Sequence, residues 1–231
     1  MSTIRATARL PVLLLMLAVI TGLVDAVSFL SLGHVFVSNM TGNIVFLGFA
    51  AAGAGNIAPQ RSLVALAMFA IGSAAGGRMS VRFGLHRGHI LSAAIALEAV
   101  LVLVTLAAAF GHFAFTADAV SYAEIVLLAL AMGVQNAAAR SVAVPDLITT
   151  VITLTMTAFA SESLLGTGTN RNAMRRVTAI GAMFLGAFIG GALVLHASVA
   201  AALAIALGLL TSTAIAVHWV SRNAPTWAQP A

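Results

Sequence analysis

The chain has 231 residues, of which 61% are hydrophobic and 7% charged, and its mean hydropathy is +1.08. Roughly a quarter of the residues of a soluble domain are charged, so this chain cannot cover a water-facing surface, and we expect an all-α integral membrane protein in contact with the lipid bilayer. Its net charge of +5 rests on arginines in small groups between apolar stretches, which excludes a nucleic-acid-binding face. The lack of cysteine excludes disulfides, thiolate metal sites and cysteine nucleophiles.

The apolar sequence starts after Arg5 and Arg9 and continues well beyond the length of a signal-peptide core. It also lacks a small-residue cleavage site at a suitable position. We therefore expect the first membrane-spanning helix here, in a single membrane domain over residues 1–231 with tails at 1–7 and 223–231.

Six apolar segments are long enough to span a bilayer, which takes about 20 residues of helix. They lie near residues 10–32, 61–78, 90–111, 121–139, 176–195 and 198–219. Two further apolar segments, near 35–54 and 147–165, are interrupted by polar residues and follow the preceding span after only a few residues. These two segments either cross the membrane or enter and leave on one side.

The arginines distinguish the two topologies, because cytoplasmic loops are rich in basic residues. If all eight segments cross and the N-terminus is inside, four arginines lie outside, namely Arg78, Arg82, Arg87 and Arg140. If the two polar segments are re-entrant, only Arg61 lies outside. We therefore expect six transmembrane helices and two re-entrant or broken segments, with both termini cytoplasmic. Eight transmembrane helices are the alternative.

The chain also contains a weak internal repeat. The segment GLVDA at 22–26 is similar to GVQNA at 133–137, and a polar segment and then a helix rich in small residues follow each of them. Residues 8–111 and 121–220 are therefore predicted to form two related halves. With three crossings each, the halves would be inverted, as in many transporters whose site lies at the repeat interface near the midplane.

Two pairs of glycines are spaced four residues apart on one helix face, Gly72 with Gly76 and Gly186 with Gly190. Such faces let two helix backbones approach closely. We expect them to be packing seams, and they are also candidates for contacts between copies in a homo-oligomer.

Asp25 is the first candidate for a functional position, since an acid inside a membrane span is costly and usually marks a pathway. It lies beside Gly22 and Ala26, on a face that should pack against another helix. The alternative is a buried acid that only holds helices together through hydrogen bonds.

The polar loop supplies further candidates, Asn39, Thr41, Gly42 and Asn43. Their amides and hydroxyl donate and accept hydrogen bonds, and the glycine permits unusual backbone angles. If a helix starts here, its free N–H groups offer a site for an anion or a dipole. Alternatively, these residues only cap that helix.

In the second half, Gln135 and Asn136 are the corresponding candidates, and Thr150 and Thr153 offer hydroxyls in the second interrupted segment. A threonine in a membrane helix often bonds only to its own backbone. Arg140 is a secondary candidate on the same helix face as Asn136, and we expect it to reach the cytoplasmic surface.

Glu98 is a second acid within an apolar span and another secondary candidate, either for a proton relay or for an interhelical hydrogen bond. The histidines are scattered without metal-ligand spacing, so we expect no metal and no cofactor. No phosphate loop, nucleophile elbow, dinucleotide glycine pattern or paired-carboxylate motif is present, so we do not expect an enzyme.

These motifs resemble those of the YoaK family of small multi-pass bacterial inner-membrane proteins. The resemblance rests on GxxDA at 22–26, FVSNMTGN at 36–43, GxQNA at 133–137 with Arg140, and TTxxT at 149–153. It implies a location in the bacterial inner membrane. It implies no substrate, because the family has no agreed biochemical role.

The leading functional hypothesis is a transporter or channel for a small molecule or an ion. Its site would be built from Asp25, the loop 39–43, and Gln135 with Asn136. The alternative is a membrane scaffold or assembly protein, in which the polar residues only fix helix packing. An intramembrane enzyme is the weakest hypothesis, since it needs a convergent acid–base pair or a metal.

Overall fold

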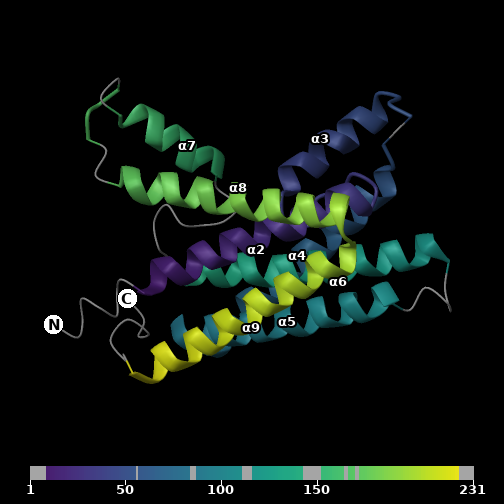
Figure 1. The fold of residues 1–231 in the computed structure, drawn as a ribbon. Helices are drawn as coiled ribbons and strands as arrows, with labels where there is room; N and C mark the ends of the chain where they lie inside the picture. Colours follow the sequence, from purple (N-terminus) through teal and green to yellow (C-terminus); the bar gives the residue numbers. More distant parts are fainter. Residues whose placement is uncertain are drawn as a thin grey trace.

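The computed structural model describes residues 9–55, 57–83, 87–110, 116–142, 152–163, 166–169 and 172–223. Thr150 and the tail 1–7 lie outside these ranges. The helices of the described part are α2 (Arg9–Ser31), α3 (Met40–Ala51), α4 (Pro59–Arg82), α5 (Arg87–Phe110), α6 (Ala117–Val142), α7 (Ile152–Ser161), α8 (Ala173–His196) and α9 (Val199–Asn223). Figure 1 shows their arrangement.

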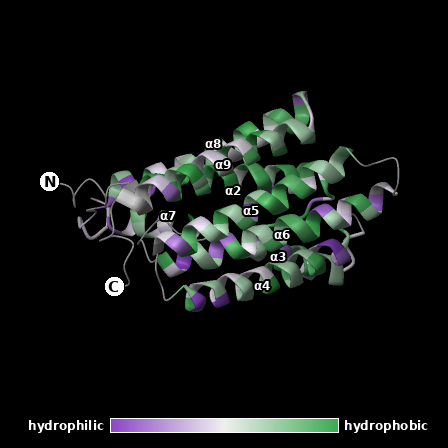
Figure 2. Ribbon diagram, turned by 90° about the horizontal axis from the view of Figure 1, so that it is seen from below, coloured by the Kyte–Doolittle hydropathy of each residue, from purple (hydrophilic) through white to green (hydrophobic). Residues whose placement is uncertain are grey.

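Six of these helices, α2, α4, α5, α6, α8 and α9, are long and apolar enough to cross a membrane. The other two, α3 and α7, have 12 and 10 residues. At 1.5 Å per residue they reach about 18 and 15 Å, against a hydrocarbon core of about 30 Å. The predicted all-α membrane fold with six spanning helices and two short, broken segments is therefore confirmed. Figure 2 shows hydrophobic residues along the long helices.

The segment that contains α3 leaves the bundle and returns to it at the same end. Gly33 and His34 turn the chain directly after α2, with φ of 86° and 59°. Arg61, in the first turn of α4, donates from Nη1 to the carbonyl oxygen of Leu32 at 2.6 Å. Since α4 begins where α2 ends, α3 is re-entrant, and the alternative of eight crossings is wrong.

The second short helix, α7, is tied to the start of α8. Arg176 donates to Glu162 through Nη1 at 2.7 Å and Nη2 at 3.1 Å, and to the carbonyl oxygen of Ala158 at 3.1 Å. Figure 1 shows that α3 and α7 both begin near the middle of the bundle and run towards opposite ends. Their N-terminal ends are therefore the parts that meet at mid-depth.

The first close helix contact joins α2 and α8, which touch through glycines. A Cβ atom at Gly22 would lie 2.8 Å from the backbone nitrogen of Ala187, and one at Gly190 would lie 2.7 Å from the carbonyl oxygen of Leu23. A Cβ at Gly186 would overlap the carbonyl oxygen of Val19. Only glycine permits these approaches, because any side chain would push the two helices apart.

The second close contact joins α4 and α6 in the same manner. A Cβ at Gly133 would lie 2.8 Å from the backbone nitrogen of Ser73, and one at Gly76 would lie 2.8 Å from the Cβ of Ala137. A Cβ at Gly72 would overlap the carbonyl oxygen of Leu130. The four glycines predicted to form packing seams are thus used within one chain, so a homo-oligomer would need other surfaces.

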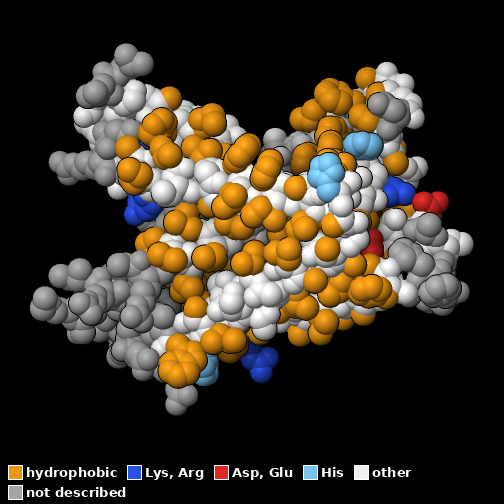
Figure 3. Space-filling view, in the orientation of Figure 1, with side chains coloured by type: hydrophobic (Ala, Val, Ile, Leu, Met, Phe, Trp, Pro, Cys, Tyr) orange, Lys and Arg blue, Asp and Glu red, His pale blue; other side chains and the backbone are white. Residues whose placement is uncertain are grey.

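The innermost spans are α2 and α6, each about two-thirds buried by the other helices. The outer helices carry large exposed apolar side chains, among them Ile71, Phe184, Phe188 and Leu195. Hydrophobic side chains are spread along the helices of the face seen in Figure 3, and the few charged ones lie towards its edges. That surface is suited to lipid tails, while α2 and α6 are shielded from them.

Candidate binding cavity between the two short helices

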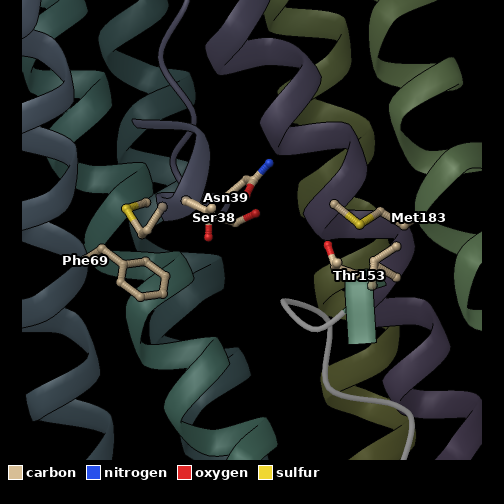
Figure 4. Close-up of a pocket in the computed structure, with 8 residues that line it drawn as sticks. Ser38, Asn39, Phe69, Thr153 and Met183 are labelled. Atoms are coloured by element: carbon tan, nitrogen blue, oxygen red, sulfur yellow. The ribbon is translucent and has the colours of Figure 1, made fainter. Parts of the chain in front are cut away.

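A cavity of about 370 Å³ lies where the N-terminal ends of α3 and α7 meet. It is lined by Ser38, Asn39, Met40, Thr41, Phe69, Ile152, Thr153 and Met183. Figure 4 shows Ser38, Asn39 and Phe69 on one side of the space and Thr153 and Met183 on the other. Hydroxyls, an amide, thioethers and an aromatic ring therefore face one small volume.

Asp25 holds the loop that forms one wall of this cavity. Its Oδ1 accepts from the backbone N–H groups of Val37 and Ser38 at 3.1 and 2.9 Å. Its Oδ2 accepts from the Ser38 hydroxyl at 2.5 Å. Asp25 is itself buried, and its carboxyl thus positions Ser38 from behind the lining.

Asn43 fixes the same loop from within α3. Its Oδ1 accepts from the N–H of Phe36 at 3.0 Å, and its Nδ2 donates to the carbonyl oxygen of Phe36 at 2.6 Å. Gly42 is required beside this pair, since a Cβ there would lie 2.8 Å from the Phe36 ring. The Phe36 ring in turn stacks on Phe29 of α2, with centroids 4.8 Å apart.

The first turn of α3 faces the cavity with its polar groups. Asn39 is the N-cap residue and makes no side-chain cap hydrogen bond. Asn39 and Thr41 are both exposed, although they lie at the mid-depth end of the helix. The positive end of the helix dipole and two side chains able to form hydrogen bonds therefore meet at one place.

Thr153 lies in the first turn of α7 and lines the cavity. It is the predicted candidate of the second half that the structure places in the lining. Its side chain is exposed. Its backbone carbonyl accepts from the hydroxyl of Thr157 at 2.9 Å. Thr155, between them, is buried, so the two faces of this short helix differ.

Gln135 and Asn136 are not among the residues that line the cavity. The Gln135 amide lies 2.8 Å from the Thr21 hydroxyl and within 3.0 Å of the Glu98 carboxyl. Asn136 donates from Nδ2 to the carbonyl oxygen of Met132 at 2.8 Å. These side chains connect and stabilise the inner helices behind the cavity.

Arg140 is exposed in the last turn of α6. Within the described residues, no group of three His, Asp or Glu side chains is placed to hold a metal ion. The lining residues outside the predicted candidates are Ser38 and Met40, which belong to the FVSNMTGN motif, and Phe69, Ile152 and Met183. Phe69 and Met183 have no distinguishing signal in the sequence, because both are apolar residues in long apolar helices.

The fold and cavity together define a polytopic α-helical membrane protein with two half-membrane helices that meet at a polar space. A family model described as "Protein of unknown function (DUF1275)" matches residues 13–216. The UPF0700 transmembrane protein YoaK of Bacillus subtilis (strain 168) is 32% identical over 161 residues, which are 68% of each chain. No solved structure matches the chain. The chain therefore belongs to the DUF1275 family. The resemblance to the YoaK family that the sequence motifs predict is confirmed.

Proposed function

We propose that this protein is a transporter or channel for a small polar solute in the bacterial inner membrane, and that the cavity between α3 and α7 is its binding site. The observation that carries the proposal is the convergence of two half-membrane helices on hydrogen-bonding side chains at mid-depth. Irregular backbone at that depth is tolerated inside protein or along a wet cavity. The proposal concerns binding and passage, without chemical conversion.

Two inverted halves are part of this proposal, because the close helix contacts repeat at constant offsets. Gly22 of α2 and Gly133 of α6 are 111 residues apart, and each approaches a helix backbone. The helices that they approach carry glycines at matching positions, Gly186 on α8 and Gly72 on α4, which are 114 residues apart. The packing of α2 on α8 therefore corresponds, residue by residue, to the packing of α6 on α4.

The same offset relates opposite walls of the cavity. Phe69 and Met183, which lie on its two sides in Figure 4, are also 114 residues apart. The loop before α3 and the first turn of α3 face the first turn of α7. In the second half of the chain, α7 holds the place that α3 holds in the first. A site at the repeat interface near the midplane is the plan shared by many transporters with broken helices.

The chemistry of the lining favours a solute that forms hydrogen bonds. Asn39 both donates and accepts, Thr41 and Thr153 do the same through hydroxyls, and the ends of α3 and α7 add positive dipole ends. The described lining residues carry no formal charge. A neutral polar molecule or a small anion therefore suits this space better than a cation.

The proposed orientation has both termini in the cytoplasm. Arg82 in the last turn of α4, Arg140 in the last turn of α6 and Arg176 near the start of α8 belong to one end of the bundle. Arg61 belongs to the other end, where it pairs with Asp118 at 3.1 Å. The larger number of arginines supports a cytoplasmic location for the first end.

Flux measurements on protein reconstituted into liposomes test the proposal. Uptake or current is screened with neutral polar solutes, small anions and small cations, and at least one of the first two classes should cross faster than in protein-free liposomes. Thr41→Val and Thr153→Val should reduce that flux several-fold. Thr157→Val, on the same helix outside the lining, is the matched control. If no solute moves, or if both lining variants retain full flux, the cavity is not a transport site.

One observation favours the second candidate, a membrane scaffold or assembly protein. Asp25 and Asn43, two buried polar residues of the first half, use their side chains to hold the loop 36–38. If that is their whole purpose, Asp25→Asn should lower thermal stability in detergent and leave flux per folded molecule unchanged. A loss of flux in a variant of full stability would instead favour the transporter.

A further inference from the structure

Glu98 lies at the centre of the bundle and is not explained by the cavity. It is fully buried on α5, and its carboxyl faces the amide of Gln135 on α6. That amide also reaches Thr21 on α2. One chain of polar groups therefore joins three membrane-spanning helices.

The hydroxyl of Thr21 limits how this chain can be bonded, because it holds a single hydrogen. Thr21 Oγ1 lies 2.8 Å from the carbonyl oxygen of Leu17 and 2.8 Å from the Gln135 amide. If it donates to Leu17, it can accept from the Gln135 amide. If it donates to Gln135, the carbonyl oxygen of Leu17 receives no hydrogen bond from it. The orientation of the Gln135 amide decides which of these occurs.

In the first orientation, Gln135 donates from Nε2 to Thr21 Oγ1 at 2.8 Å, and Thr21 donates to Leu17. The amide oxygen of Gln135 then faces the two carboxyl oxygens of Glu98. Two acceptors cannot bond without a hydrogen between them, so this arrangement requires a proton on Glu98, which donates to Gln135.

In the second orientation, the amide nitrogen of Gln135 donates to the two carboxyl oxygens of Glu98, at 2.8 and 3.0 Å. The amide oxygen then accepts from Thr21 Oγ1 at 2.8 Å. In this arrangement both carboxyl oxygens of Glu98 act as acceptors, as they do in the ionised carboxylate. The two arrangements differ by one proton, one half-turn of an amide and one hydroxyl hydrogen.

We propose that Glu98, Gln135 and Thr21 form a proton-binding site at the junction of α5, α6 and α2. A hydronium ion gives up a proton, which forms the O–H bond of the Glu98 carboxyl and leaves a water molecule. The Gln135 amide turns by half a revolution, and the hydrogen bond from the Thr21 hydroxyl moves from Gln135 to Leu17. No other covalent bond is made or broken. In each protonation state the Glu98 carboxyl has a hydrogen-bonding partner, without which a buried acid is costly.

The charged groups around Glu98 have partners of their own or lie on other helices. Among the described side chains, the titratable ones on the helices packed against α5 are Arg61, Arg78 and Arg82 of α4; Asp118, Tyr122, Glu124 and Arg140 of α6; and His218 of α9. Asp25 lies on α2, the helix of Thr21. Asp25 is bonded to the loop at Ser38, and Arg61 is paired with Asp118. Within the described residues, no ion pair joins Glu98 to an arginine. Gln135 is therefore the group that responds to its protonation.

Infrared spectroscopy of the full-length protein tests this site, and it needs no transported solute. The chain contains three glutamates, Glu98, Glu124 and Glu162. Protein labelled with ¹³C at the glutamate carboxyl is prepared with Glu124→Gln and Glu162→Asp, so that Glu98 alone carries the label and Arg176 keeps a carboxylate partner. The C=O band of a protonated, labelled carboxyl should appear on acidification and disappear on alkalinisation. It should be absent in Glu98→Gln.

A second variant tests the role of the amide. Gln135→Leu removes the hydrogen-bond acceptor of protonated Glu98, so the labelled band should shift to higher wavenumber. A labelled carboxyl that stays in one state at every pH at which the protein is folded would overturn the proposal. So would a band that Gln135→Leu leaves in place. Neither result depends on whether the cavity transports a solute, so the two proposals can fail separately.

Discussion

Asp25 in α2 accepts two hydrogen bonds from Ser38, one from its backbone N–H at 2.9 Å and one from its hydroxyl at 2.5 Å. Ser38 lines the cavity. An acid on a spanning helix therefore sets the position of the loop that follows the end of that helix. This contact makes the shape of the cavity depend on the packing of α2.

Removal of the Asp25 carboxyl should destabilise the protein in a graded manner. Asp25→Ala leaves the N–H groups of Val37 and Ser38 without their acceptor, and should lower the free energy of unfolding by about 3 kcal/mol. Asp25→Asn keeps one accepting oxygen for both N–H groups and should cost about 1 kcal/mol. Chemical denaturation in detergent measures both values. Equal losses for the two variants would contradict this assignment of the hydrogen bonds.

Asn43 should tolerate no change in its pattern of donor and acceptor. Asn43→Asp places a carboxyl oxygen against the carbonyl oxygen of Phe36, where Nδ2 now donates at 2.6 Å. It should therefore destabilise the protein more than Asn43→Ala, by about 1–3 kcal/mol beyond the loss for alanine. The order of the melting temperatures in detergent checks this. If the aspartate variant is the more stable of the two, the paired geometry with Phe36 is wrong.

The glycine seams should be sensitive to a single methyl group. In Gly186→Ala the new Cβ overlaps the carbonyl oxygen of Val19, so α2 and α8 must separate. We expect the free energy of unfolding to fall by about 1–3 kcal/mol, as is typical for overpacking in a core. Gly181→Ala in the same helix is the matched control, since nothing lies within 4 Å of its Cβ, and it should be neutral or stabilising. Similar melting temperatures for both variants would contradict the seam.

The ion pair between Arg176 and Glu162 should hold α7 against α8. Arg176→Gln removes both contacts to the carboxylate and weakens the one to Ala158, so the amides of α7 should exchange with deuterium faster. Arg78→Gln, at an exposed position of α4, provides the control and should leave that exchange unchanged. Unaltered exchange in Arg176→Gln would mean that other contacts hold α7.

Most of the fold could be predicted from the sequence, because span length and arginine placement are direct consequences of the bilayer. The six predicted spans correspond to the six long helices. The re-entrant course of α3 followed from counting arginines, and the contact of Arg61 with Leu32 confirms it. These features depend on local composition, which a single sequence contains.

The candidate site could be predicted only in part. Asn39, Thr41 and Thr153 are predictable as polar residues in apolar surroundings, and all three line the cavity. Phe69 and Met183 were missed because an apolar residue that faces a cavity has the same sequence signature as one that faces lipid. Gln135 was selected for its polarity but lies behind the cavity, since the direction of a side chain depends on which helices pack together.

The central claim is that the meeting point of α3 and α7 is a water-accessible cavity at mid-depth, and cysteine labelling tests it most directly. The natural chain has no cysteine, so each variant contains one thiol. Thr41→Cys and Thr153→Cys should react with a charged, membrane-impermeant thiosulfonate, because the thiolate that reacts forms only in contact with water. Ile44→Cys, at an exposed position of α3 outside the lining, should face lipid and react at least about tenfold more slowly. If both cavity variants react as slowly as Ile44→Cys in the folded protein, and rapidly after denaturation, the cavity is closed to water and the account is wrong.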